Sequence, residues 1–378
     1  MAARIAFATS LTLSVAAEGQ PAPVFDQAIR GVTIGPIENA YHPGTGYGSE
    51  PYGRTLGEST RWGANFIALT PFGRVGSLEG HGVDPTFEMP APENEKAVRS
   101  AIRMAHASGL KVMLVPHLWV ESGEWRALID PKTDAGWEKW ARSYGAFLKR
   151  WAKVAEGEHV DLLSVGVELR SWVTTSRAPS FSALIREVRA IYKGPLTYSA
   201  NWDDVSDTII LGEVDLIGIN AFYPLADQDG SPFTKLYEGA KGVRDKVRAL
   251  GEAWQKPVLF TEIGYTARPN PAIKPWEWPD GMKGVVVDQA AQAEAYRALL
   301  APLLDEPSFA GFFVWRVYAD PEDVSQEAEW GFSPRGKRAE LEVRAAMGGS
   351  FASDRALVRR WHPAGARVGV YPWVGPFR

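Results

Sequence analysis

Short apolar runs recur along the sequence, and they constrain the fold more than any other feature. Past residue 29, eight of them alternate with longer segments of helical periodicity. They cover residues 30–35, 65–70, 111–116, 162–167, 195–200, 214–220, 257–261 and 309–315. Near-continuous apolar runs of this length are typical of strands buried on both faces, as in a parallel sheet. With right-handed crossovers, eight such repeats predict an α/β fold, a (β/α)8 TIM barrel.

The segments between the runs have the period of amphipathic helices. We expect helices over 95–108, 137–153, 181–191, 237–250, 289–304 and 337–347, with about two helical turns within 204–211. In 137–153 large rings recur at spacings of three and four, at Trp137, Trp140, Tyr144 and Trp151. We interpret them as a helix face packed on the barrel rather than as sugar platforms. The barrel is expected to occupy residues 28–348 as a single domain.

A doubly wound open sheet is the alternative topology. No Gly-x-Gly-x-x-Gly follows the first apolar run, and no Gly-Lys-Ser/Thr occurs anywhere, which disfavours the nucleotide-binding forms of that fold. The glycine-rich stretch 44–53 has neither spacing. We interpret it as a flexible loop over the mouth of the barrel.

Composition excludes several classes of function. The chain has no cysteine, so disulfides, thiolate zinc sites, iron–sulfur clusters and cysteine nucleophiles are ruled out. With 41 basic and 45 acidic residues it shows no electrostatic footprint for nucleic acid. Tryptophan is unusually frequent, at 15 copies. Tryptophan-rich soluble proteins often bind sugars, because the indole face stacks on the apolar face of a pyranose.

Both ends of the chain lie outside the barrel pattern. Residues 1–20 resemble a secretory signal peptide, with Arg4 before an apolar stretch over 5–17 and small residues at its end. The alternative is an N-terminal helix. The stretch is too short to span a bilayer, so we expect a secreted or periplasmic protein with no membrane span. Residues 349–378 lack a barrel pattern and predict a tail that packs outside the barrel or is partly disordered.

Polar and aromatic residues follow the predicted strands, at the end where TIM barrels carry their active sites. They are Arg74, His117, Trp119, Glu168, Asn201, Trp202, Asn220, Tyr223, Glu262 and Trp315. Glu168 and Glu262 each directly follow an apolar run, the fourth and the seventh. Two carboxyl groups that face each other across a cleft are what glycoside hydrolysis requires. The alternative is that each glutamate forms a stabilising ion pair with an arginine. Two glutamates at these positions, together with aromatic and amide residues at other strand ends, favour catalysis.

Tryptophans in loops are better candidates for sugar platforms than those in helices. Trp276 and Trp278 lie in the proline-rich segment 269–279 after the seventh run, and Trp330 follows the eighth. We expect Trp276 and Trp330 to bind substrate, with hydrophobic plugs as the alternative interpretation.

Two other functions compete with glycoside hydrolysis. The six histidines form neither His-x-His nor His-Glu-x-x-His, so we expect no metal site and no cofactor. A non-catalytic carbohydrate-binding barrel in a cell-surface assembly would keep the aromatic residues, but it would not need both glutamates. The sequence therefore favours an enzyme, with the binding module as the alternative.

Six motifs in order along the chain resemble the clan A glycoside hydrolases, and most closely glycoside hydrolase family 113, whose known members are mainly β-mannanases. They are RGVTIG (30–35), VPHLW (115–119), GVEL (166–169), YSANWDD (198–204), TEIGY (261–265) and GFSPRGK (331–337). The resemblance implies a retaining, endo-1,4-β-mannosidase-like enzyme acting on a β-linked polysaccharide or oligosaccharide, mannan first. It leaves the exact β-glycan, endo or exo action and the oligomeric state open.

The resemblance also implies roles for single residues. Clan A enzymes place the acid/base glutamate after the fourth strand and the nucleophile after the seventh, which match Glu168 and Glu262. It implies an ionised Glu262 held by Tyr223 and Arg74, a raised pKa for Glu168, and carboxyl groups about 5–5.5 Å apart. Trp315 matches the tryptophan that ends the eighth strand in the clan.

One position departs from the clan pattern. Many clan A enzymes have an asparagine directly before the acid/base, where its amide holds the sugar 2-hydroxyl. This chain has Val167 there. We expect Asn201, on the neighbouring strand, to supply the missing donor.

Overall fold

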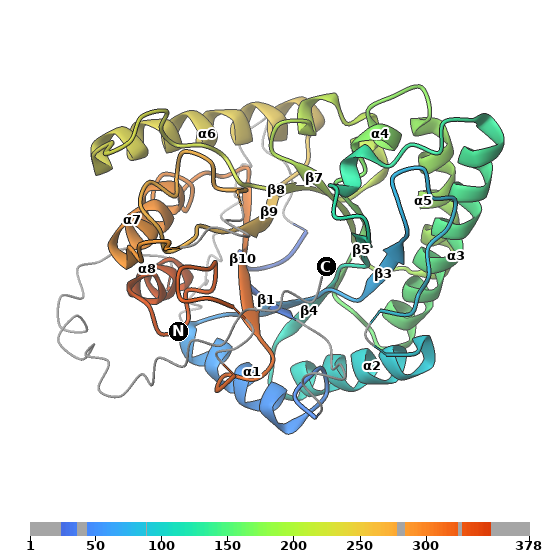
Figure 1. The fold of residues 1–378 in the computed structure, drawn as a ribbon, viewed down its shortest axis with the longest axis horizontal. Coiled ribbons are helices and arrows are strands. Elements are labelled where there is room, and N and C mark those ends of the chain that lie inside the picture. Colours follow the sequence, from blue (N-terminus) through green and yellow to red (C-terminus); the bar gives the residue numbers. More distant parts are fainter. Residues whose placement is uncertain (1–23, 36–43, 88, 278–283, 324–326, 349–378) are drawn as a thin grey trace, which may run out of the picture.

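The computed structural model describes residues 24–35, 44–87, 89–277, 284–323 and 327–348. Within them, parallel strands close into a barrel in the order β1-β10-β9-β8-β7-β6-β4-β2 (Figure 1). Their bounds are β1 Ile29–Gly35, β2 Phe66–Leu69, β4 Lys111–Leu114, β6 Leu162–Val167, β7 Leu196–Asn201, β8 Leu216–Asn220, β9 Val258–Ile263 and β10 Phe309–Tyr318. The predicted single-domain TIM barrel is confirmed, with each strand at its expected place.

A small parallel sheet continues two of the barrel strands. It pairs β3 (Phe72–Val75) with β5 (His117–Val120), directly after β2 and β4. Pro71 and Pro116 separate each barrel strand from its extension, because proline has no N–H to donate to the ladder. The extension carries His117 and Trp119 past the end of the barrel.

Helices surround the ring of strands (Figure 1). They are α1 Glu50–Trp62, α2 Ala91–Ala107, α3 Asp134–Gly157, α4 Arg170–Val173, α5 Ala178–Ile191, α6 Phe233–Trp254, α7 Gln289–Leu300 and α8 Arg338–Met347. The short connection between β7 and β8 contains the 3₁₀ turns η2 (Val205–Asp207) and η3 (Ile209–Glu213), and a further turn, η1 (Arg126–Leu128), follows β5. The six helices expected from periodicity are all present.

The structure of the glycine-rich stretch 44–53 differs from the flexible loop that we expected. Its end is the start of α1, where the Ser49 hydroxyl accepts a hydrogen bond from the Tyr52 backbone and caps the helix. The buried Tyr47 hydroxyl donates to the Ile34 carbonyl and accepts from the Thr70 backbone N–H at 3.1 Å. Serine capping and buried tyrosines, rather than glycine content, decide the structure here.

Two apolar layers result from the alternation of side chains along the strands. Phe66 and Ala68 of β2 belong to a cluster formed by strand residues, which fills the barrel. Ile67 and Leu69 belong to the larger cluster shared with the helices. That cluster includes the predicted tryptophan-rich face of α3, whose rings are buried as core, confirming the structural interpretation of those rings.

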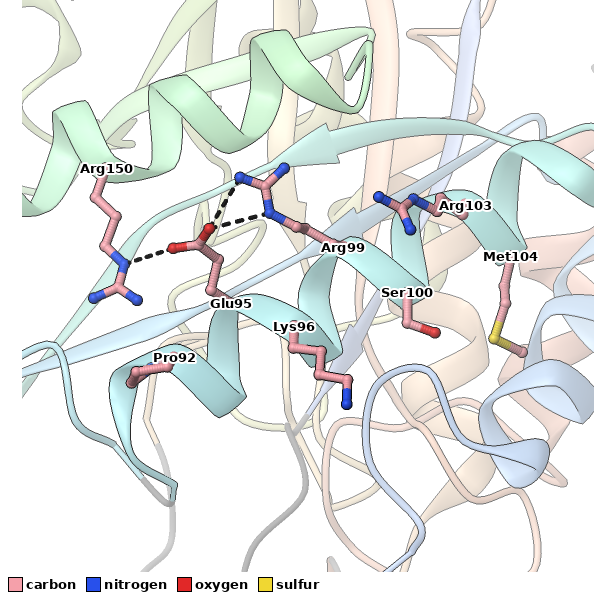
Figure 2. Close-up of a pocket in the computed structure, with 8 residues that line it drawn as sticks. All are labelled: Pro92, Glu95, Lys96, Arg99, Ser100, Arg103, Met104 and Arg150. Carbon is pink, nitrogen blue, oxygen red and sulfur yellow. Dashed lines mark hydrogen bonds and ion pairs between the residues drawn. The ribbon is translucent and has the colours of Figure 1, made fainter.

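An ion-pair network ties α2 to α3 on the outside of the molecule (Figure 2). Glu95 accepts hydrogen bonds from Arg99 and Arg150, each at 2.9 Å, and Arg99 and Arg103 both reach Glu158. These residues surround a shallow surface hollow that none of the predicted site residues lines. Glu95 and the three arginines are paired within the network, and Lys96 also lines the hollow.

Several expectations fall outside the described residues: the signal peptide at 1–20, Trp278 and the tail at 349–378. Among the helices that the structure describes, none is long and apolar enough to cross a membrane.

Candidate active site

The two glutamates stand at the same end of the barrel. Glu168 directly follows β6, and Glu262 lies near the end of β9. Both are buried, with 6% and 7% of their surface exposed. They are close enough for the charge of Glu168 to raise the pKa of Glu262. The structure thus brings together the carboxyl pair that the sequence predicted.

Glu168 leaves the strand in an unusual backbone conformation. Its φ is 51°, in the left-handed region that residues other than glycine seldom occupy. The Glu168 N–H donates to the Ser199 carbonyl at 2.8 Å, and the next N–H, of Leu169, donates to the buried Tyr198 hydroxyl at 2.7 Å. These bonds hold the turn in place. Backbone strain of this kind clusters at functional sites, where it aims a side chain.

Three donors converge on the Glu168 carboxyl group. Arg126 Nη1 and Trp125 Nε1 donate to Oε2 at 2.7 and 2.8 Å, and Asn220 Nδ2 donates to Oε1 at 3.0 Å. The Arg126 and Glu168 side chains are only 18% and 8% exposed, so their ion pair is largely shielded from water. Charge-assisted bonds in such surroundings are stronger than neutral ones.

Sequence reasoning missed Trp125 and Arg126. Both lie in or beside η1, in the connection after β5, whereas we considered only the first polar residues past each strand. A signal was available, because an adjacent tryptophan and arginine in a barrel-mouth loop combine a ring, an N–H donor and a fixed charge. Nothing in the spacing indicated that the loop turns back toward Glu168.

Glu262 has different surroundings. Burial and the nearby Glu168 raise the pKa of Glu262 to about 8, and Arg126, Arg316 and Asn220 oppose that rise. His117 Nε2 lies 3.8 Å from Glu262 Oε1. In the free protein this raised pKa favours the protonated form of Glu262 over the ionised form that we expected. The depth of burial and the donors around each carboxyl are not encoded in spacing, so the sequence could not indicate the direction of the shift.

Asn220 links the two carboxyl groups. It is 1% exposed, and its Oδ1 accepts from the Thr261 hydroxyl at 2.9 Å, so its amide nitrogen faces the glutamates. Besides donating to Glu168, it stands opposite Glu262 in the β8–β9 register and lowers the pKa of that carboxyl. The Asn201 amide instead donates to Asp203 at 2.7 Å. The amide that meets the pair is thus that of Asn220, and the role of Asn201 as the donor that replaces the asparagine absent at Val167 stays a prediction.

His117 and Trp315 complete the wall on the Glu262 side. The His117 ring is 1% exposed and lies between Phe72 and Trp315, with ring centroids 4.6 and 6.2 Å away. Burial, and then Arg126 and Arg316, hold the pKa of His117 well below its usual value, so the ring is neutral. The Trp315 ring is partly exposed and has the Arg316 guanidinium over it at 5.1 Å.

A second aromatic group lies beyond the fifth and seventh barrel strands. Trp276, which is 47% exposed, stacks on Trp202 with centroids 5.3 Å apart, and Trp202 contacts Tyr223 at 5.5 Å. The other ring partner of Tyr223 is Phe260, at 6.2 Å. The structure therefore places Tyr223 among tilted aromatic rings, and its expected contact with Glu262 stays a prediction.

The remaining predicted site residues make contacts with other side chains and backbone groups. Arg74 stands opposite Trp119 in the β3–β5 sheet, forms an ion pair with Glu121 at 3.1 Å, and lies over Phe87. Trp330 is partly buried, and its carbonyl accepts from the Ala267 N–H at 2.7 Å. Their part in substrate binding stays a prediction. Across the described ranges, no group of three or more histidine, aspartate or glutamate side chains could hold a metal ion.

Comparison with known proteins decides the family. The model of Glycoside Hydrolase Family 113 matches residues 50–337, which contain both glutamates. The chain belongs to Glycoside Hydrolase Family 113. The resemblance inferred from six motifs is therefore confirmed, and this family 113 chain is a glycosidase.

Solved structures agree with the assignment. The family 113 chain is 25% identical to the GH113 β-mannanase AaManA from Alicyclobacillus acidocaldarius, solved with ManMIm. That match covers 86% of this chain and 99% of that one, with a TM-score of 0.73. A GH113 β-1,4-mannanase is 23% identical over 85% of this chain and 99% of its own, with a TM-score of 0.71, which shows the shared fold. No curated protein matches the sequence.

Proposed function

We propose that this family 113 glycosidase hydrolyses β-1,4-mannan with retention of anomeric configuration, using Glu168 as acid/base and Glu262 as nucleophile. The observation that carries the proposal is the buried carboxyl pair that meets at Asn220, with one carboxyl in an ion pair and the other with a raised pKa. Glycoside hydrolysis by two carboxyl groups needs this inventory of one proton and one negative charge.

The chemistry proceeds in two displacements. In the first, Glu262 attacks the anomeric carbon while Glu168 gives its proton to the departing glycosidic oxygen, so the leaving group departs as a neutral alcohol. In the second, Glu168 takes a proton from a water molecule, which attacks the same carbon and releases Glu262. Both carboxyl groups return to their starting protonation states.

The proton must move from Glu262 to Glu168 before the first displacement. In the free enzyme it lies on Glu262, whereas the acid role requires it on Glu168. A bound sugar supplies both driving forces: its glycosidic oxygen accepts from a protonated Glu168, and a ring hydroxyl donates to an ionised Glu262. A hydrogen bond that is made to only one protonation state of a carboxyl group favours that state. The bound sugar therefore favours the protonated form of Glu168 and the ionised form of Glu262.

Retention is supported by the adjacency of the pair. Retaining enzymes hold the carboxyl groups about 5–5.5 Å apart, and inverting enzymes leave room for a water molecule between them, at about 6.5–9.5 Å. Here a single amide side chain is a neighbour of both groups, and the charge of one acts on the other. Such closeness favours the shorter separation.

Mannan is proposed because the 25% identical relative is a β-mannanase that aligns over nearly its whole length. Platforms for the sugar chain are available on both sides of the pair. Trp315 lies beside His117 and is proposed to contact the sugar at the scissile bond. The exposed Trp276, stacked on Trp202, is proposed to bind a more distant sugar.

We also propose that the protein is exported, on the signal-like character of residues 1–20. A polymeric mannan cannot cross a membrane, so an enzyme that cleaves it acts outside the cytoplasm. N-terminal analysis of protein recovered from the medium or periplasm tests this proposal. A start near residue 20 supports export, and retention of residue 1 in the cytoplasm contradicts it.

The deciding experiment measures reducing ends released from β-mannan, glucomannan, xylan, cellulose and chitosan. The wild type, Glu168→Gln, Glu262→Gln and the surface control Arg142→Gln are compared, since Arg142 is 69% exposed on α3. We expect release from mannan by the wild type and the control, and at least a thousandfold loss in both glutamate variants. Mannan binding without release of reducing ends by the wild type would favour the carbohydrate-binding module instead.

A further inference from the structure

We infer that Trp125 and Arg126, here called the clamp, are positioning residues of the catalytic pair. They fix the Glu168 carboxyl and supply a positive charge to both glutamates. The inference rests on the proposed roles of Glu168 and Glu262, and it assigns a function to a loop that neither the family motifs nor the strand ends indicated.

The clamp arginine is held from three sides. Its Nη1 donates to Glu168 Oε2 at 2.7 Å, and its Nε donates to the Leu118 carbonyl at 3.1 Å. Its Nη2 lies 3.4 Å from His117 Nε2. Because Leu118 and His117 belong to β5, the planar guanidinium is fixed in orientation against a strand before it meets the carboxylate. A fixed fork of donors specifies the carboxylate position more strictly than a lysine ammonium would.

The clamp tryptophan is held by a different set of contacts. Its Nε1 donates to the same Glu168 oxygen at 2.8 Å, while the Arg170 guanidinium lies 4.8 Å from its ring centre. Arg170 is in turn held by ion pairs with Asp203 and Asp204 after β7. Glu168 Oε2 thus accepts hydrogen bonds from two donors, and each donor side chain contacts a different part of the barrel.

The charge of the clamp reaches both carboxyl groups. Arg126 opposes the rise in the pKa of Glu262 and lowers the pKa of His117. Other charged or titratable groups also face this cluster. Arg316 from β10 lowers the pKa values of Glu262 and His117. Arg170 and Asp204 interact electrostatically with Glu168. Arg126 is in direct contact with Glu168 and acts on Glu262 through its charge. Its removal should make the pair keep its shared proton to higher pH.

The clamp bonds to the acid/base rather than to the nucleophile, and this predicts a dependence on the leaving group. Substrates with a poor leaving group, such as mannan oligosaccharides, need protonation by Glu168. Dinitrophenyl β-mannoside needs little. A misplaced Glu168 should therefore lower kcat/KM about ten- to hundredfold for oligosaccharides, the usual effect of losing a charge-assisted hydrogen bond, and much less for the aryl substrate.

The test uses three variants and one control in the full-length protein. Arg126→Gln removes the charge, Arg126→Lys keeps the charge but loses the fork, and Trp125→Phe keeps a ring for Arg170 but loses the N–H. Arg142→Gln is the matched surface control. Each protein is measured for kcat/KM against pH on both substrates, and the Glu262 carboxyl is titrated by ¹³C NMR in the absence of substrate, with thermal unfolding as a check on folding.

We expect all three clamp variants to lose oligosaccharide activity selectively. We expect Arg126→Gln alone to raise the pKa of Glu262 clearly, because Arg126→Lys retains a cation. Equal losses on both substrates, or an unchanged Glu262 titration in Arg126→Gln, would overturn the inference. The titration needs no substrate. If the wild type cleaves no β-glycan but Arg126→Gln still raises the pKa of Glu262, the result contradicts the proposed function while supporting the shared charge. If Arg126→Gln does not fold, Arg126→Lys and Trp125→Phe still decide the leaving-group test.

Discussion

Thr261 donates its hydroxyl hydrogen to Asn220 Oδ1 at 2.9 Å, and this bond orients the amide that joins the catalytic pair. Thr261 lies next to Glu262 on β9, and Asn220 ends β8. The strand that carries one glutamate therefore also orients the donor to the other. Without this bond, only the hydrogen bond to Glu168 would orient the amide.

Thr261→Val should therefore lower kcat about tenfold, because the isosteric side chain cannot hold the Asn220 amide in place. Thr197→Val is the matched control, since the Thr197 hydroxyl is equally buried but donates to the Leu216 carbonyl at 3.0 Å. Both variants should lose about 1 kcal/mol of stability. Steady-state kinetics and denaturant unfolding check this, and equal kinetic losses in the two variants would show that the effect is merely structural.

The pH dependence of kcat/KM should have its upper limit near the pKa of Glu262, about 8. The active pair holds one proton, and kcat/KM reports the free enzyme. As pH rises through that value, the pair loses the proton that Glu168 needs as acid, so activity falls. An initial-rate profile on mannotetraose from pH 4 to 10 measures it. A rate that continues to rise above pH 9 would contradict this assignment.

Glu262→Gln should stabilise the protein at neutral and alkaline pH while abolishing turnover. Burial raises the pKa of Glu262 from 4.5 in the unfolded chain to about 8. The stability contribution of the protonated carboxyl is complete below pH 4.5 and is lost as pH rises through about 8. A glutamine cannot ionise, so the variant should match the wild type at pH 4 and gain increasingly above it, by about 2–4 °C in Tm per kcal/mol. Calorimetry at pH 4, 6 and 8.5 tests the sign.

Trp276→Ala should lower kcat/KM about fivefold for long mannan chains and leave short substrates nearly unchanged, since one stacking contact is worth about 1 kcal/mol. Trp254→Ala is the control, because Trp254 is 37% exposed at the end of α6, before β9 begins and away from the strand ends that carry the pair. Kinetics on mannobiose to mannohexaose check the prediction. Equal losses on short and long chains would mean that Trp276 supports its loop instead of holding sugar.

The fold was accessible from the sequence because the apolar runs are continuous. Runs such as 162–167 and 257–261 lie on strands buried on both faces, and their spacing left one economical closure. The stretch 44–53 was misjudged because its order comes from Ser49 capping α1 and from the buried Tyr47, which are tertiary effects. Glycine content alone could not reveal them.

The site was accessible only in part. Glu168 and Glu262 could be predicted because they directly follow strands, where position along the chain fixes position in the barrel. Trp125 and Arg126 could not, because a loop residue reaches the site through a backbone path that periodicity does not describe. The raised pKa of Glu262 could not be predicted either, since it depends on burial and on charges from separate elements.

Trapping the glycosyl-enzyme tests directly whether Glu262 is the nucleophile of a retaining reaction. Incubation with 2-deoxy-2-fluoro-β-mannosyl fluoride should slow the second displacement and leave the sugar attached, and peptide mass spectrometry locates it. We expect one fluoromannosyl group per chain, esterified to Glu262 and absent from Glu262→Gln. A label on Glu168 would reverse the roles, and steady turnover of the reagent without any labelled peptide would contradict a covalent, retaining mechanism.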